Sequence, residues 1–434
     1  YENKKVSIQQ AVTAIKSNDS VVIGQINGES FPIMEELSRH TDRLKNVEIV
    51  QLNPCGDSVC SKEGMEESFR YNILFVGPGA RKAIFAQRAD FTPAFFAEVP
   101  RLFKENILPV DVAILHLSPP DENGYLSYGT NCDYMKAAAE SAKIVIAEVN
   151  KQMPYTYGTT IHVSEIDHIV ETDRPLLEGQ PPVITDVEQK IGANVASLIS
   201  DGSNLQLGIG AIPGAILNFL TDKKDLGIHT EMFSDGVIDL YNRGVITNKC
   251  NNLNPGKFTT TFVMGTKKLY DFVNKNELVT MLPVDHTNHI LVAGRVNNLV
   301  SVNSAIQIDL FGQVCADTIG YKQYSGVGGQ VDFVRAASVS EGGKSIIAMT
   351  STAKDNTVSK IVLKLAEGAC VTTSRHDVHY VVTEHGIADL RGQSTENRAK
   401  RLINIAHPAF REQLAKEAYS AGLIRSHEFC AVAK

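Results

Sequence analysis

The sequence lacks several features that would narrow its function at once. Its seven cysteines form no C-x-x-C pair, and only Cys55 and Cys60 lie close together. A metal site is therefore not expected, and reduced thiols in a cytoplasmic protein are the simpler interpretation. No apolar run approaches the length of a membrane span, and the charged start Tyr1–Lys5 lacks the apolar core of a signal peptide.

The sequence also has fewer basic than acidic residues. The chain carries 42 Lys and Arg against 49 Asp and Glu, a formal net charge of -7. Nucleic acids and anionic membranes require a basic face, so neither is expected as a partner. A small phosphorylated ligand stays compatible, because a few N–H groups and one or two basic side chains suffice. With 434 residues, 43% of them hydrophobic, the chain can build two or three domains around a substantial core.

Short β-branched runs alternate with helical patterns along the chain. Strands are expected over residues 20–24, 47–52, 110–117, 144–147, 204–207, 257–264, 345–349 and 380–383. Such alternation is typical of βαβ units and mostly parallel sheets. Ser7 and Gln10 form a capping box, which predicts a helix that begins after Ser7 and buries Ala11, Val12 and Ile15 on one face.

One order of elements occurs twice. Residues 11–52 and residues 194–235 both read as helix, turn, strand, glycine, helix and strand. This repetition predicts two open α/β domains, residues 1–185 and 186–434, related by internal duplication, although any two βαβ units look somewhat alike. Ligands of such folds lie beyond the carboxyl ends of the strands, where Gly208 and Glu231 are expected.

The polar segment His229–Gly236 contains Glu231, which lies between two glycine-rich loops in the sequence. Gly208–Gly214 follows an expected strand and opens a helix, so its N–H groups can face an anion. Gly326–Gly329 has three glycines in four residues. A carboxylate between loops rich in free N–H groups indicates covalent carboxyl chemistry with an oxyanion hole, and hence acyl transfer.

Simpler interpretations stay open for each part. The glycine turn followed by an acid also imitates a dinucleotide-binding fingerprint, although its third glycine comes one residue late. Both loops could be structural turns, and Glu231 could be an ordinary surface acid or helix cap. His286 and His289 beside Asp285 have metal-ligand spacing but no third ligand nearby.

Long strings at many separated places resemble the acetyl-CoA hydrolase/transferase family of CoA-transferases. The similarity extends over nearly the whole chain and is carried by the strings at residues 118–121, 162–167, 205–213, 226–232, 264–267, 311–313, 325–333, 371–375 and 402–408. Membership of that family implies an α/β fold of two open, mostly parallel domains of the CoA-transferase type. It also implies a homodimer or larger homo-oligomer.

The resemblance further implies a ping-pong reaction in which Glu231 becomes acylated and then carries CoA as a thioester. CoA moves between an acyl-CoA, such as acetyl-CoA or butyryl-CoA, and a short carboxylic acid such as 4-hydroxybutyrate. CoA and acyl-CoA are substrates, and no metal or other permanently bound cofactor is implied. The family places CoA beside both glycine loops and a third segment, with these expected contacts: Gly208, Ile209, Gly210, Ala211, Ile212, Asn303, Ile306, Gly328 and Gly329.

One loop departs from the family pattern. Residues 24–30 lack the histidine-containing pattern of the members that use 4-hydroxybutyrate, so acetate, propionate, butyrate and 4-hydroxybutyrate all stay open. The alternatives are an acyl-CoA hydrolase that uses the same glutamate, a nicotinamide-dependent dehydrogenase, and a non-catalytic CoA-binding protein.

Overall fold

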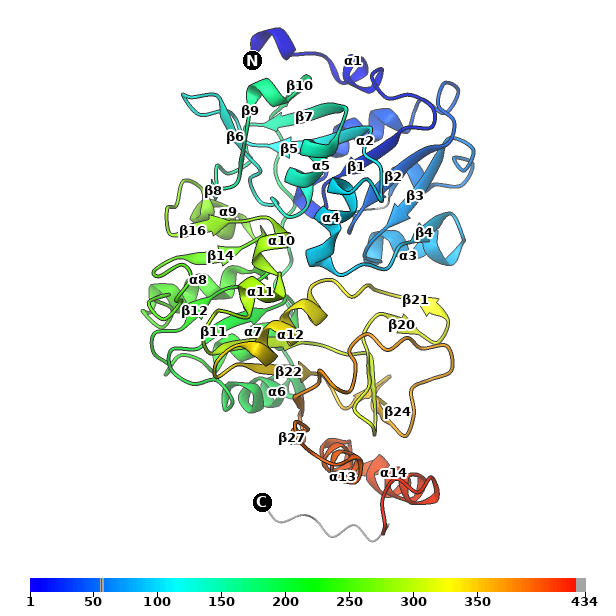
Figure 1. Cartoon of the computed structure of the whole chain (residues 1–434), viewed down its shortest axis with the longest axis vertical. Helices are drawn as coiled ribbons and strands as arrows, with labels where there is room; N and C mark the ends of the chain where they lie inside the picture. Colours follow the sequence, from blue (N-terminus) through cyan, green and yellow to red (C-terminus); the bar gives the residue numbers. More distant parts are fainter. Residues whose placement is uncertain (55, 57, 427–434) are drawn as a thin grey trace.

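Two largely parallel β-sheets, one in each half of the chain, organise the fold (Figure 1). The protein's computed structural model describes residues 1–54, 56 and 58–426. Of the predicted reduced thiols, Cys55 and Cys430 lie outside these residues, and the other five cysteines are free. In this described part of the chain, no helix is long and apolar enough to cross a membrane.

The first sheet has seven parallel strands in the order β10-β7-β5-β1-β2-β3-β4. Every residue of β5 is buried, as expected for a parallel strand that is covered on both faces. The strands are β1 Ser20–Ile23, β2 Val47–Gln51, β3 Phe69–Ile73, β4 Ala89–Phe91, β5 Val112–Leu117, β7 Ile144–Asn150 and β10 His168–Thr172. The helices of this half are α1 Ile8–Val12, α2 Phe31–Leu37, α3 Pro78–Phe85, α4 Val99–Lys104 and α5 Met135–Ser141.

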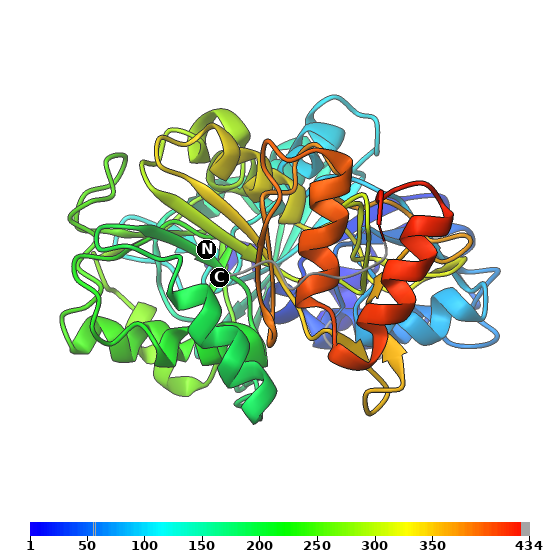
Figure 2. The same cartoon turned by 90° about the horizontal axis from the view of Figure 1, so that it is seen from below.

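The second sheet has the order β12-β11-β17-β22-β26-β27, and only the β26–β27 pair is antiparallel. Its strands are β11 Asn204–Leu207, β12 Gly227–Ile228, β17 Leu299–Asn303, β22 Lys344–Ala348, β26 Tyr380–Thr383 and β27 Gly386–Asp389. The helices are α6 Asp186–Ala196, α7 Ala211–Asn218, α8 Asp235–Asn242, α9 Lys267–Val273, α10 Val284–Thr287, α11 Ile290–Ala293, α12 Gln330–Val339, α13 Thr395–Ile405 and α14 Pro408–Ser420. Helices α13 and α14 lie side by side at the end of the molecule (Figure 2).

Both sheets are doubly wound. Numbered within each half, the first sheet has the strand order 4-3-2-1-5-6-7 and the second has the order 2-1-3-4-5-6, so in both the order reverses beside the first strand. Ligands of such sheets bind at the point of reversal. In this chain the two reversal points are the carboxyl ends of β1 and β5 and of β11 and β17.

Most of the sequence-based elements are confirmed within one or two residues. The capping box of Ser7 and Gln10 starts α1, although that helix ends at Val12. The predicted strand over residues 257–264 is wrong as one strand. It is broken into β14 Phe258–Thr260, which pairs with β16 Val279–Met281, and β15 Phe262–Val263, which pairs with β13 Met232–Phe233. The break occurs because the backbone turns at Thr261 to hydrogen-bond the carbonyl of Glu231.

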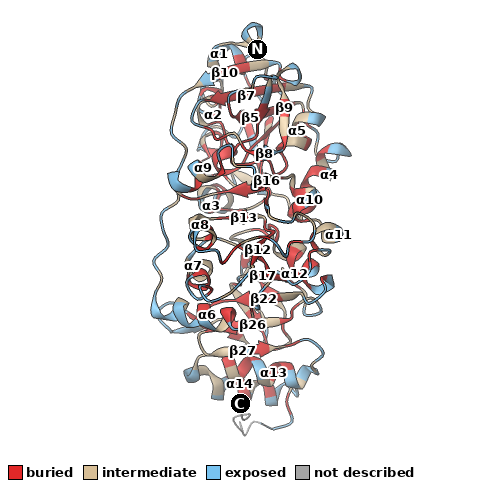
Figure 3. Cartoon of the chain, turned by 90° about the vertical axis from the view of Figure 1, so that its left-hand side faces the viewer, coloured by how far each residue is buried: buried red, intermediate tan, exposed pale blue. Residues whose placement is uncertain are grey.

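Small strand pairs complete the fold around the sheets. They are formed by β6 Tyr125–Ser127, β8 Tyr157–Gly158, β9 Thr160–His162, β18 Gln307–Asp309, β19 Val314–Cys315, β20 Thr318–Ile319, β21 Lys322–Gln323, β23 Thr352–Ala353, β24 Val358–Ser359 and β25 Ile361–Val362. Buried residues follow the sheets through both halves, while the helices expose their outer faces (Figure 3). Both sheets are complete on either side of residues 173–203, so the predicted domain boundary at 185 falls between them and stays a prediction.

Candidate active site

Glu231 lies between two short strands, on a backbone that is fixed from several sides. Strand β12 ends at Ile228, β13 begins at Met232, and the Glu231 carbonyl accepts hydrogen bonds from Thr261 N, Phe262 N and Thr260 Oγ1 at 3.1, 3.1 and 2.9 Å. These three bonds hold the Glu231 backbone, so its side chain has a defined direction into the space between the halves.

The carboxyl group of Glu231 borders a cavity of about 390 Å³ between the two halves of the chain. The second half contributes residues that follow β11 and β17, together with the loop before α12. Of the predicted contact residues, Gly208, Ile209, Asn303, Ile306, Gly328 and Gly329 line this cavity with Glu231. The structure therefore brings both glycine loops and the third predicted segment to one place, at the reversal point of the second sheet.

Gly210, Ala211 and Ile212 lie on the far side of the first glycine loop. Gly210 has a φ of 114° and caps α7, a conformation that favours glycine. It faces a second cavity of about 820 Å³ beneath residues 179–184, and Ile209 borders both cavities. Ala211 and Ile212 form the first turn of α7 and line neither cavity. Contact of these three residues with CoA stays a prediction.

Two groups donate hydrogen bonds to the Glu231 carboxylate. Asn288 Nδ2 lies 2.8 Å from Glu231 Oε2, and the N–H of Gly329 also stabilises the carboxylate. A Cβ atom at Gly329 would overlap both Glu231 Oε2 and Asn288 Nδ2, so any side chain there would displace this pair. An amide and a backbone N–H that converge on one carboxyl group form the kind of donor pair that stabilises an oxyanion.

The surroundings make the carboxyl group of Glu231 hard to ionise. Burial raises its pKa from the ordinary 4.5 to about 8, against the opposing effect of the Asn288 hydrogen bond. Asp332 and Asp133 raise it further through their negative charge. The pKa values of these two acids are themselves raised by burial, to about 7 for Asp332 and about 6 for Asp133. A carboxylate that is poorly stabilised in this way is a better nucleophile than one in water.

His229 supports the site without facing the cavity. Its Nε2–H donates to the carbonyl of Thr287 at 2.8 Å, directly before Asn288. The ring is fully buried, and burial lowers its pKa to about 4, which keeps it neutral. His229 therefore ties the strand before Glu231 to the segment that carries Asn288.

The first half of the chain forms the opposite wall of the cavity, with Gln25, Ile26, Leu52, Asn53 and Phe75. These residues follow the strands β1, β2 and β3, beside the reversal point of the first sheet. Hydrogen bonds join the walls, because Phe96 N donates to the Gly328 carbonyl at 3.1 Å and Ala97 N to Asp332 Oδ2 at 3.0 Å.

Sequence reasoning missed Asn288, Asp332 and the wall from the first half. Asn288 stands in the Asp285–His289 segment, whose histidines drew attention as metal ligands, whereas the amide makes the contact. Asp332 follows Gly329 by almost one helical turn, and that spacing was its only signal. No cluster of three potential metal ligands occurs among residues 1–54, 56 and 58–426, and His289 caps α11.

Comparison with known proteins gives full-length relatives. The chain matches the family models described as acetyl-CoA hydrolase/transferase N-terminal domain over residues 1–178 and C-terminal domain over residues 265–418. It is 56% identical to a 4-hydroxybutyrate coenzyme A transferase of Clostridium kluyveri, over 96% of this chain and 97% of that protein. It is 43% identical to a succinyl-CoA:cyclohexane-1-carboxylate CoA transferase of Geobacter metallireducens, over 96% and 95% of the two chains.

A solved structure shares the fold over nearly the full length. RipA from Yersinia pestis superposes with a TM-score of 0.93 at 35% identity, covering 98% of this chain and 99% of that one.

Proposed function

Because the chain belongs to the acetyl-CoA hydrolase/transferase family and is an acyl-CoA:carboxylate CoA-transferase, we propose that it works by a ping-pong mechanism through a glutamyl-CoA thioester at Glu231. The observation that carries the proposal is the convergence of Asn288 Nδ2 and the Gly329 N–H on a half-buried glutamate beside a cavity. CoA and acyl-CoA enter as substrates, and the transfer needs no metal or redox cofactor.

Each step of the proposed reaction balances without an external reagent. A carboxylate oxygen of Glu231 attacks the thioester carbonyl, the C–S bond breaks, and CoA leaves as a thiolate from a mixed anhydride. The thiolate then attacks the Glu231 carbonyl, which releases the first acid as its carboxylate and leaves the glutamyl-CoA thioester. The second acid reverses both steps and departs as a new acyl-CoA.

The donors around Glu231 suit these steps. The tetrahedral intermediate at the Glu231 carbonyl carries a negative oxygen that Asn288 and Gly329 can hold in place. Removal of one such donor typically costs 10²- to 10³-fold in rate. We place the pantetheine end of CoA beside Asn303–Ile306, since this segment lines the same cavity.

The acid pair is a finer part of the proposal. By analogy with the 56% identical relative, 4-hydroxybutyrate with acetyl-CoA or butyryl-CoA is the first combination to test. The relative that is 43% identical is named for a cyclic acid, so substrate choice varies among similar chains. The dehydrogenase alternative loses its basis, since it rested only on a glycine turn followed by an acid.

Two further properties belong to the proposal. We infer a homodimer or larger homo-oligomer by analogy with the family, and light scattering of the purified protein would measure it. Cytoplasmic placement is inferred from the unpaired cysteines, five of which are free thiols.

The test is to trap the covalent intermediate. The protein is incubated with butyryl-CoA without an acceptor acid, reduced with borohydride, and digested for peptide mass mapping. The proposal predicts reduction of the thioester to an alcohol at Glu231, with loss of activity. Unmodified Glu231 in protein that still consumes butyryl-CoA would exclude the covalent mechanism. Release of CoA that needs no acceptor acid would indicate the hydrolase alternative.

A further inference from the structure

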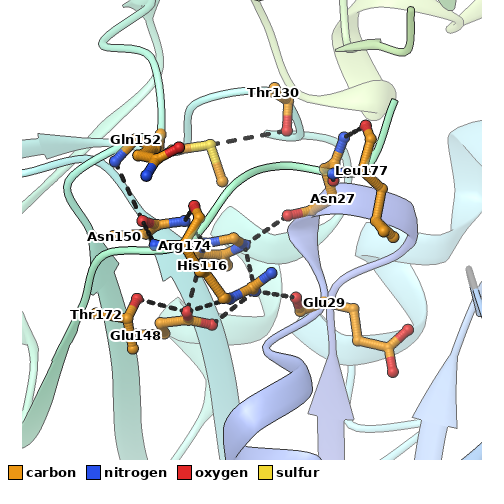
Figure 4. Close-up of polar contacts among 11 residues, drawn as sticks. Asn27, Glu29, His116, Thr130, Glu148, Asn150, Gln152, Thr172, Arg174 and Leu177 are labelled. Atoms are coloured by element: carbon orange, nitrogen blue, oxygen red, sulfur yellow. Dashed lines mark hydrogen bonds and ion pairs between the residues drawn. The ribbon is translucent and has the colours of Figure 1, made fainter. Parts of the chain in front are cut away.

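A buried polar cluster lies in the first half of the chain, outside the catalytic cavity (Figure 4). His116 from β5, with Glu148 and Asn150 from β7, meets Arg174 from the segment that leaves the first sheet. His116, Glu148 and Asn150 are almost fully buried. Polar groups in such a place are costly unless each has a partner, so the contacts of this cluster show what it holds.

Arg174 and Glu148 form a forked ion pair at the base of the cluster. Arg174 Nε lies 2.7 Å from Glu148 Oε1, Arg174 Nη2 lies 2.9 Å from Oε2, and Thr172 Oγ1 donates to Oε1 at 2.6 Å. Arg174 Nη2 also donates to the carbonyl of Glu29 at 3.2 Å. The pair therefore reaches from the sheet to the loop of residues 25–29, which we call the Gln25–Glu29 loop.

The hydrogen bonds of His116 assign its tautomer. Nδ1 lies 2.6 Å from the carbonyl oxygen of Asn27, which can only accept, so Nδ1 carries the proton. Nε2 accepts from Asn150 Nδ2 at 3.2 Å. The ring is thus neutral, and burial, which lowers its pKa to about 4, agrees with this assignment. A neutral His116 fastens the middle of the Gln25–Glu29 loop.

The side chain of Asn27 fastens the same loop from the other direction. Its Nδ2 donates to the Leu177 carbonyl at 3.0 Å and to Tyr270 Oη at 2.8 Å, and its Oδ1 accepts from Leu177 N at 2.8 Å. Tyr270 belongs to α9 in the second half of the chain. The loop is therefore held by hydrogen bonds from β5, from the connecting segment and from the second half of the chain.

These contacts matter because the other end of the loop forms a wall of the catalytic cavity. Gln25 and Ile26 line that cavity, and Gln25 Nε2 donates to Asp133 Oδ2 at 2.8 Å. Ile26 has a φ of 49°, a left-handed conformation that is unfavourable for a β-branched side chain. Such strain persists only where surrounding contacts impose it, and it concentrates at functional sites.

We propose that His116, backed by the Arg174–Glu148 pair, is a positioning residue that holds Ile26 and Gln25 as the wall selecting the carboxylic acid. This inference rests on the proposed function, because it assigns the wall of that same site. His116 acts only through the Asn27 carbonyl and touches no substrate. Without its hydrogen bond the loop relaxes, Ile26 leaves the left-handed conformation, and the wall loses its shape.

The experiment compares two replacements of His116. The amide nitrogen of His116→Asn can occupy the place of Nδ1 and still donate to Asn27, whereas His116→Leu cannot. Kinetics with butyrate and 4-hydroxybutyrate as acceptors give kcat/KM for each acid. We expect the ratio of these two values to change about 10-fold in His116→Leu and less than about 2-fold in His116→Asn, as for a small misplacement of a binding wall. The inhibition constant of desulfo-CoA, which reports the CoA side of the site, should stay the same in both.

A second measurement is independent of catalysis. Hydrogen exchange of the peptide that contains Ile26, Gly28 and Glu29 should be faster in His116→Leu and close to wild type in His116→Asn. His379→Leu is the matched control, because His379 is also buried but stacks on Tyr380 in the second half. If His116→Leu fails to fold, Tyr270→Phe serves instead, since it removes only the hydroxyl that holds Asn27 and Leu177.

The outcomes separate the two proposals. Unchanged exchange in the loop, equal behaviour of His116→Asn and His116→Leu, or a looser loop with unaltered acid selectivity would each overturn the positioning role. If the loop exchanges faster in His116→Leu as expected but the wild-type protein transfers no CoA, the proposed function alone is overturned.

Discussion

Replacement of Glu231 by Gln should stabilise the free protein, and increasingly so as the pH rises. Below its ordinary pKa of 4.5 the carboxyl is protonated in both the folded and the unfolded chain, so its titration does not change the free energy of unfolding there. Between 4.5 and about 8 the folded form keeps the proton that the unfolded chain releases, and stability is lost with rising pH. Above about 8 the folded protein holds a poorly solvated carboxylate, which the uncharged amide of Gln avoids.

The size of this stability difference follows from the rise in the pKa of Glu231. Each pH unit between the two pKa values corresponds to about 1.4 kcal/mol, which gives an upper bound of about 5 kcal/mol at high pH. Between about pH 6 and pH 8 the gap between Glu231→Gln and wild type should widen by about 3 kcal/mol. Urea denaturation of both proteins across this range measures it, with the exposed Glu63→Gln as control. A gap that is independent of pH would refute a buried, hard-to-ionise Glu231.

Three other substitutions test the site and its support. Asn288→Ala should lower kcat by about 10²- to 10³-fold, because it removes a donor to Glu231, and borohydride trapping would show less thioester. Gly329→Ala should abolish more than about 99% of the transfer rate, since its Cβ overlaps Glu231. Gly56→Ala is the control, because open space surrounds the Cβ there and the rate should not change. Wild-type kinetics in Gly329→Ala would contradict the geometry of the site. Arg398→Met should lower the free energy of unfolding by about 3 kcal/mol, because three carbonyls, of Phe311, Arg375 and Leu390, lose their donor; an unchanged urea midpoint would contradict this.

Elements with strong local signals could be predicted from the sequence. The capping box at Ser7, the strand before Gly208 and the helix opened by that loop are encoded within a few residues of each other. The two glycine loops and Glu231 could be proposed as one site because their residue types share one chemistry. The break at Thr261 could not be predicted, since it depends on hydrogen bonds to Glu231, which is thirty residues away in the chain.

The rest of the site depends on contacts between distant segments. Asn288 reaches Glu231 from the C-terminal cap of α10, and no pattern around Asn288 distinguishes it from its polar neighbours. Ile26 reads as an ordinary buried apolar residue, and its left-handed conformation is imposed by the packing of the Gln25–Glu29 loop. The departure of the Gln25–Glu29 loop from the family pattern is visible in the sequence. The position of this loop beside the cavity is not visible there, because it depends on contacts with distant segments.

The strand order of both sheets reverses beside the first strand of the half, and this has a consequence for how the two halves contribute to the site. The loop after β1 and the loop after β11 occupy equivalent places in their sheets, and both border the same cavity. The second half thus supplies Glu231 and its donors, and in our proposal the first half supplies the surface that discriminates among acids. If the proposal holds, mutations in the first half can retune substrate choice while Glu231 and its donors, which belong to the second half, keep their arrangement.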